Sequence, residues 1–246
     1  MGETIAVSNF MIYTLGLVVF FVYLWGGFVF YKKAIDSHIE DSLALDVIVL
    51  SAFWSFILGR VSFVLTNLDS FYGHWSRIFL LVNYPGIERW GALLGIILAV
   101  FYIVKKKKGK FFDFFDLVTL GVLSGSAFYW VGINFINFYW QNLVVAVINF
   151  LGFVWFWNLE KTYRHISWYR GSKTFAKSGF VSGFGLVFLG FSFILENILF
   201  RNFNIFNVIL MLVLFIGGMV LVYIRSGRLL ADDLKSINIW NKRIKK

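Results

Sequence analysis

The sequence predicts an all-α, polytopic integral membrane protein with about seven transmembrane helices, an outer N-terminus and a cytoplasmic C-terminus. The 246 residues are 59% hydrophobic, and long apolar runs alternate with short polar segments. A helix needs roughly 20 apolar residues to cross a bilayer, and these runs have about that length. All but four of the 23 Lys and Arg residues fall in four clusters: Lys32–Lys33, Lys105–Lys110, Lys161–Lys177 and Arg225–Lys246.

The basic clusters also orient the expected spans. The four clusters follow the first, third, fifth and seventh expected spans, one cluster after each. Lys and Arg favour the cytoplasmic side of a membrane. Of the other cations, Arg60 falls within the second span, and Arg77, Arg89 and Arg201 fall on the opposite side. We therefore expect a seven-helix transmembrane domain over residues 1–224 and a basic cytoplasmic tail over residues 225–246, with a surface helix around Leu229–Ile239.

Seven segments have the length and hydrophobicity of spans. We place them at residues 8–30, 45–66, 90–104, 112–131, 142–158, 179–200 and 205–224. Met1–Ser8 has no basic region and no A-x-A site follows it, so we interpret it as the start of the first span rather than as a cleaved signal peptide. Glycine groups such as Gly91 and Gly95, Gly121 and Gly125, and Gly179, Gly183 and Gly185 predict close helix contacts.

Composition excludes several classes of site. The chain has no cysteine, so it has no disulfide, no thiolate nucleophile and no cysteine-ligated metal. We expect no metal and no cofactor. The lysine run at Lys105–Lys108 and Lys110 lies beside a span, which favours an anchor to anionic lipid over a nucleic-acid site.

Polar residues inside the expected spans converge on one level near the outer surface. Such residues are costly in a bilayer and tend to mark a site or a helix contact. The residues at this level are Arg60, Arg89, Asn134, Asn137, Glu196 and Arg201. They predict a site that faces the outer leaflet. A structural alternative is that Arg60 and Glu196 neutralise each other and that Asn134 and Asn137 only cap or join helices.

Five segments in order resemble one known family. They are Gly59-Arg60-Val61-Ser62-Phe63-Val64-Leu65, Gly91-Ala92-Leu93-Leu94-Gly95-Ile96-Ile97-Leu98-Ala99, Phe115-Asp116-Leu117-Val118, Gly132-Ile133-Asn134-Phe135-Ile136-Asn137 and Phe191-Ser192-Phe193-Ile194-Leu195-Glu196. With the expected topology, they resemble the prolipoprotein diacylglyceryl transferases, seven-span enzymes of the bacterial inner membrane with an outward N-terminus. The likeness covers about residues 8–224.

The chain departs from the family pattern at several functional positions. The family histidine, the signature arginine, the last signature glutamate and the late arginine fall at Trp90, Val131, Tyr139 and Ser192. A further family segment is reduced to Gln141. The family positions that keep their residue type are Asn134, Asn137, Glu196 and Arg60.

The resemblance implies transfer of diacylglycerol from phosphatidylglycerol to the lipobox cysteine thiol of a lipoprotein precursor, in the bacterial plasma membrane. It implies that Glu196, Asn134 and Asn137 act in catalysis. The reaction also needs a cation for the phosphate, for which Arg60, Arg89 and Arg201 are the candidates, and a base for the thiol, for which His74 is a second candidate beside Glu196. The alternative is a catalytically degenerate homologue that binds lipid or another membrane protein. A small transporter or channel is a third hypothesis, although no helix pair interrupted by Gly or Pro supports it.

Overall fold

The computed structural model describes residues 4–7, 10–80, 84, 86–107, 110–163, 176–201 and 205–226. The chain divides into two compact units, Met1–Val147 and Ile148–Lys246, and each is described by itself. The predicted basic tail, including the expected surface helix at Leu229–Ile239, lies outside the described residues from Gly227 onward.

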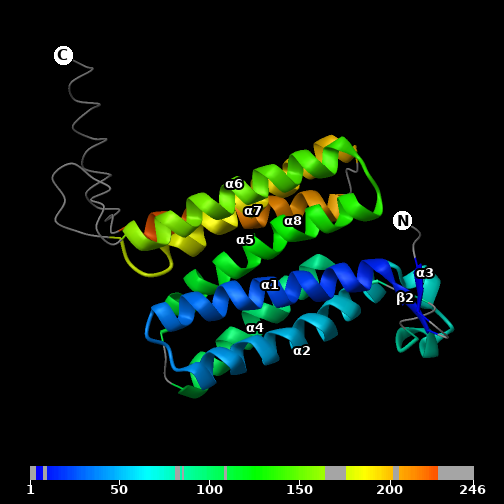
Figure 1. The fold of residues 1–246 in the computed structure, drawn as a ribbon, viewed down its shortest axis with the longest axis horizontal. Coiled ribbons are helices and arrows are strands. Elements are labelled where there is room, and N and C mark those ends of the chain that lie inside the picture. The colour runs from blue at the N-terminus through cyan, green and yellow to red at the C-terminus, as the bar shows by residue number, and fades with distance from the viewer. Residues whose placement is uncertain are drawn as a thin grey trace, which may run out of the picture. The chain divides into compact units, whose positions relative to one another are not determined.

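Seven long helices in the described residues follow the seven expected spans in order (Figure 1). They are α1 (Thr14–Asp36), α2 (Asp41–Thr66), α4 (Arg89–Lys107), α5 (Phe111–Ile136), α6 (Trp140–Thr162), α7 (Phe180–Phe200) and α8 (Ile205–Arg225). All of these except α4 are long and apolar enough to cross a membrane. The 19-residue α4 differs because it carries Arg89 at one end and Lys105–Lys107 at the other. The prediction of a polytopic helical membrane protein is confirmed.

The N-terminus differs from the sequence prediction. Residues 4–13 contain two antiparallel strands, β1 (Thr4–Val7) and β2 (Phe10–Tyr13), with Thr4 opposite Tyr13 and Val7 opposite Phe10. The first helix therefore begins at Thr14, and the expectation of a span from residue 8 is wrong. Both strands are rich in β-branched and aromatic residues, which favour a pleated backbone over a helix.

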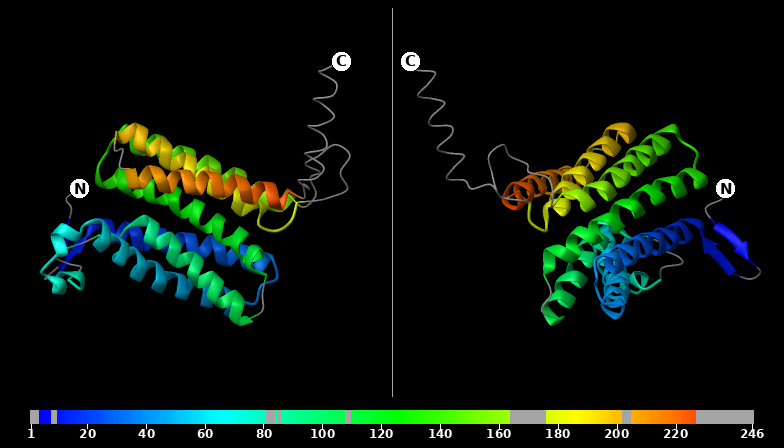
Figure 2. Two further views of the ribbon diagram at one scale, coloured as in Figure 1. Left: turned by 180° about the vertical axis from the view of Figure 1, so that it is seen from behind. Right: turned by 60° about the vertical axis from the view of Figure 1, so that its left-hand side comes forward.

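Glycines bring three pairs of helices into close contact, as the sequence predicts. In the first unit, α2 packs on α4 and α1 packs on α5, and in the second α7 packs on α8 (Figure 2). A Cβ on Gly95 of α4 would collide with the backbone of Trp54 and Ser55 on α2. A Cβ on Gly26 of α1 would lie 2.8 Å from the carbonyl oxygen of Gly121. Small residues allow this approach because helices in a membrane associate through packing rather than through water exclusion.

A hydrophobic core joins the four long helices of the first unit at one end. It gathers buried residues from α1, α2, α4 and α5: Phe30, Ala34, Ala44, Val47, Val100, Ile103, Val104, Phe114, Leu117 and Val118. These residues come from the end of α1, the start of α2, the end of α4 and the start of α5. The core therefore lies at the end that the basic clusters predict to be cytoplasmic. Four of the predicted site residues, Arg60, Arg89, Asn134 and Asn137, lie at the opposite end of this unit.

Candidate functional site

The opposite end of the first unit collects four of the predicted site residues. The start of α4 and the ends of α2 and α5 are at this same end of the unit (Figure 1). Arg60 is in the last two turns of α2, Arg89 begins α4, and Asn134 and Asn137 lie at the end of α5. The short helix α3 (Leu68–Phe71) and the 3₁₀ helix η1 (Trp75–Ile78) belong to the segment that connects α2 to α4.

Arg60 is buried and is bound by the backbone of this connecting segment. Its Nε donates to the carbonyl oxygen of Ile78 at 2.9 Å, and its Nη2 donates to that of Arg77 at 3.1 Å. Its Nη1 donates to the carbonyl oxygens of Tyr84 at 2.8 Å and Gly86 at 3.1 Å. A guanidinium has five N–H groups, so four of them are used on backbone carbonyls of the connecting segment.

Aromatic rings complete the surroundings of the Arg60 guanidinium. Its central carbon lies 5.6 Å from the ring centre of Phe63 and 5.4 Å from that of Phe71, within the range of cation–π contacts. The two rings also meet edge to face, with centres 6.2 Å apart. The charge is therefore enclosed by rings and carbonyl dipoles, which compensate for the water it has lost.

The connecting segment returns alongside α2 before α4 begins. The backbone N–H of Glu88 donates to the carbonyl oxygen of Gly59 at 2.9 Å, seven residues before the end of α2. Seven residues correspond to about 10 Å along a helix. Non-helical backbone thus lies beside the last two turns of an apolar helix, where carbonyl groups need partners from the protein. Arg60 supplies four such partners.

This geometry gives Arg60 a defined structural task. The sequence predicted that Arg60 binds substrate. A bound phosphate would need N–H donors, whereas four of the five N–H groups of Arg60 bond to backbone carbonyl oxygens.

Of the other cations at this end, Arg89 is exposed at the start of α4. Arg77 donates to the carbonyl oxygen of Ser70 at 3.2 Å and lies 5.0 Å from the ring of Tyr84. His74, the second candidate base, is exposed and directly precedes η1.

The end of α5 carries the two predicted asparagines. Asn134 is half-buried, and within the described part of the chain its buried Oδ1 accepts no hydrogen bond. Gln141, in the first turn of α6, likewise has a buried Oε1 without a donor among those residues. Asn137 caps α5 and its carbonyl oxygen accepts a 2.9 Å hydrogen bond from Nδ2 of buried Asn142. Asn137 therefore helps to shape the turn, whereas Asn134 presents an acceptor.

The remaining two predicted residues are in the second unit. Glu196 is half-buried in the second-to-last turn of α7, and Arg201 is exposed at its C-terminal cap. Arg201 has a φ of 52°, a left-handed backbone that ends the helix. Arg60 and Glu196 thus belong to different units, and the alternative in which they neutralise each other stays a prediction.

Sequence reasoning missed a buried polar pair in the second unit. Asn149 on α6 is completely buried, and its Nδ2 donates to Oγ of buried Ser192 on α7 at 2.9 Å. Ser192 is the position at which the family resemblance places an arginine. A signal was available, because Asn149 interrupts an apolar run in the middle of an expected span.

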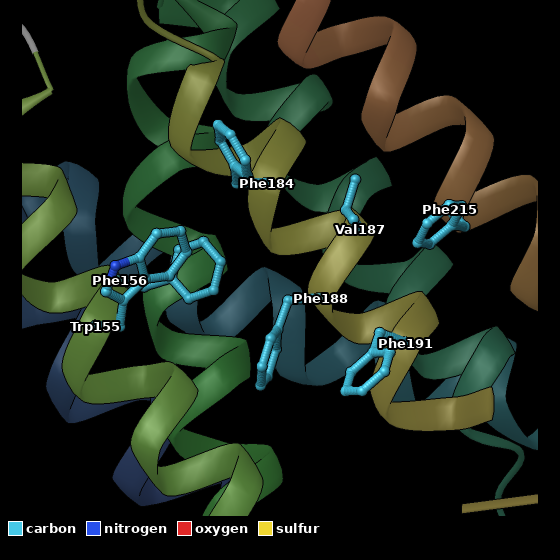
Figure 3. Close-up of a pocket in the computed structure, with 7 residues that line it drawn as sticks. All are labelled: Trp155, Phe156, Phe184, Val187, Phe188, Phe191 and Phe215. Carbon is cyan, nitrogen blue, oxygen red and sulfur yellow. The ribbon is translucent and has the colours of Figure 1, made fainter. Parts of the chain in front are cut away.

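An apolar hollow of about 250 Å³ opens among the helices of the second unit (Figure 3). Its lining comes from α6, α7 and α8 and is almost entirely aromatic: Trp155, Phe156, Phe184, Val187, Phe188, Phe191 and Phe215. In the view of Figure 3 the α7 side chains follow one face of the helix. None of the predicted site residues belongs to this lining.

Comparison with known protein families shows to which family the chain is related. The model of the family described as prolipoprotein diacylglyceryl transferase matches residues 3–141, which is more than half of the chain. The chain belongs to this family. The match contains Arg60, Arg89, Asn134 and Asn137, whereas Glu196 and Arg201 lie beyond it.

A curated relative supports the assignment to the diacylglyceryl transferase family. The phosphatidylglycerol–prolipoprotein diacylglyceryl transferase of Deinococcus radiodurans is 29% identical over 123 residues. The aligned stretch covers 48% of this chain and 36% of the relative. The aligned stretch thus spans about a third of the relative's length.

Proposed function

We propose that this protein moves diacylglycerol from phosphatidylglycerol to the lipobox cysteine thiol of a lipoprotein precursor in the bacterial plasma membrane. The observation that carries the proposal is Asn134. It lies in the stretch that matches the transferase family, and its buried side-chain oxygen has no donor in the described residues. The glycerol hydroxyl of a phosphatidylglycerol head group is a donor of the required kind.

The proposed reaction forms one bond and breaks one. The thiol sulfur bonds to the terminal carbon of the diacylglycerol, the bond between that carbon and the phosphate oxygen breaks, and glycerol phosphate leaves. The thiol proton needs a base, and the departing phosphate needs cations or hydrogen-bond donors. No change of oxidation state and no cofactor are involved.

Each predicted residue takes one part in this proposal. Glu196 accepts the thiol proton, and Asn134 and Asn137 hold the head group. Arg89 and Arg201 are exposed at helix ends, and an arginine fork suits a phosphate because it binds two oxygens. Arg60 contributes to substrate binding through the connecting segment that it fastens.

The direct test is transfer to a lipobox peptide. The purified protein in nanodiscs containing phosphatidylglycerol is incubated with the peptide, and the thioether adduct is measured by mass spectrometry. We expect Asn134→Ala and Glu196→Gln each to lower the rate at least about tenfold, the size of a lost hydrogen bond or base in a transition state. Asn158→Ala is the matched control, because Asn158 is exposed and bonds to its own helix. No adduct under conditions in which an established family member reacts would refute the proposal.

A second candidate is a degenerate homologue that binds phosphatidylglycerol without turnover. The specific observation in its favour is Ser192, which occupies the late arginine position and is buried in a hydrogen bond with Asn149. A ligand that binds only the folded state raises stability by mass action. This candidate therefore predicts that phosphatidylglycerol protects the protein against heat while no adduct forms. If expression of this protein restored the growth of a strain depleted of its own transferase, that result would contradict the degenerate-homologue candidate.

A further inference from the structure

The segment between α2 and α4 has two different faces. Its inner face contains Phe71, which is 2% exposed, and the carbonyl groups that bind Arg60. Its outer face exposes large side chains: Tyr72 is 79% exposed, Trp75 60% and Phe79 84%. Leu68 and Leu80 are exposed on the same segment. We call these five exposed residues the outer apolar face.

We propose that the outer apolar face is a membrane-binding surface that inserts into the interface between lipid head groups and acyl chains. Soluble surfaces rarely expose so many large apolar side chains in one short segment, and such a patch marks an interaction site. Tyrosine and tryptophan are the residues enriched where a membrane protein meets the boundary of the bilayer, because their rings are apolar and their polar groups remain near water.

The position of the segment selects lipid as the partner. The segment starts at the end of α2, a helix apolar enough to cross a membrane, and it returns to Gly59 on the same helix. It is therefore confined to the boundary region of the bilayer. A 26-residue helix is about 39 Å long, whereas the hydrocarbon core is about 30 Å thick, so the last turn of α2 reaches the head groups.

The Arg60 contacts explain how the surface stays presented. Four carbonyl groups of the segment are fastened to one buried side chain, so the backbone does not need to turn inward to find partners. The exposed rings are then free to face lipid. This inference does not depend on the transferase activity, because an inactive homologue would need the same anchoring.

The absence of cysteine allows a direct test of depth. Single cysteines replace Tyr72 or Phe79, and a fluorescent label is attached to each in nanodiscs. Ser76→Cys is the matched control, since Ser76 is an exposed polar residue of the same segment. We expect lipids with a brominated or spin-labelled acyl chain to quench the Tyr72→Cys and Phe79→Cys labels at least twofold more than the Ser76→Cys label, and aqueous iodide to show the reverse order.

Three results would count against the inference. Equal quenching by lipid at all three positions would show that the outer apolar face does not enter the bilayer. Stronger quenching by iodide at Phe79→Cys than at Ser76→Cys would leave the outer apolar face as a surface for another protein. A further variant adds Trp75→Ser, which carries no label, to the labelled Phe79→Cys protein. We expect the added substitution to lower the lipid quenching of the label at Phe79→Cys. An unchanged value would also count against the proposal.

Discussion

Asn149 on α6 donates a 2.9 Å hydrogen bond to the hydroxyl of Ser192 on α7, and both side chains are buried between apolar helices. The bond joins residues 43 positions apart in the chain. Ser192 occupies the position at which the family resemblance places an arginine. A buried polar pair in this setting stabilises one particular packing of the two helices, since the alternative leaves polar groups in hydrocarbon.

Replacing Asn149 by Leu should destabilise the second unit by about 1–2 kcal/mol, close to the upper range measured for hydrogen bonds between membrane helices. Ser192→Ala should also destabilise the unit, because it removes the hydroxyl that accepts the hydrogen bond of the buried Asn149 Nδ2, whereas after Asn149→Leu the Ser192 hydroxyl can bond to its own helix. Thermal unfolding in detergent measures both. The double variant should lose less than the two single losses added together, and strict additivity would show that the pair does not interact. Asn158→Leu, which changes an exposed asparagine on the same helix, should have little effect.

Replacing Gly95 by Ala should separate α2 from α4. Its new methyl group would collide with the backbone of Trp54 and Ser55, which has no freedom to rotate away. Overpacking of this kind costs about 1–3 kcal/mol. Gly27→Ala is the control in the same unit, because its Cβ would lie 3.4 Å from Cγ2 of Ile48, which is an ordinary van der Waals contact. Equal melting temperatures for the two variants would contradict the close contact.

Replacing Arg60 by Gln should release the connecting segment. Each buried carbonyl group left without a donor costs about 1–3 kcal/mol, and four carbonyls depend on Arg60. We expect a lower melting temperature and faster proteolysis between Ser70 and Tyr84. Arg60→Lys should recover only part of the loss, because an ammonium has three donors and no planar fork. Lys106→Gln removes an exposed charge from α4 and serves as the control.

The predicted orientation is tested by reporters of membrane side. A reporter fused after Lys246 should be active only in the cytoplasm, and one inserted near Tyr72 should be active only outside. The alternation of basic clusters motivates both expectations. The outer placement of Arg89 and Asn134 depends on the same rule. If both reporters give the opposite reading, the candidate site faces the cytoplasm.

The amino-acid pattern alone predicted the seven long helices, the glycine contacts and the family. These features depend on local properties, namely the length of apolar runs, the spacing of small residues and short motifs. The paired strands Thr4–Val7 and Phe10–Tyr13 were missed because apolar residues with high strand propensity also match the start of a span. Periodicity cannot separate the two in so short a segment.

The partners of Arg60 and Asn149 were decided by the tertiary structure. A sequence shows that a charged or polar residue in an apolar run needs compensation, but it does not show which groups provide it. For Arg60 these are backbone carbonyls 17 to 26 residues away, and every residue type carries a carbonyl. Their placement depends on the path of the connecting segment beside α2. Only the packed fold brings that path within hydrogen-bond distance of the guanidinium.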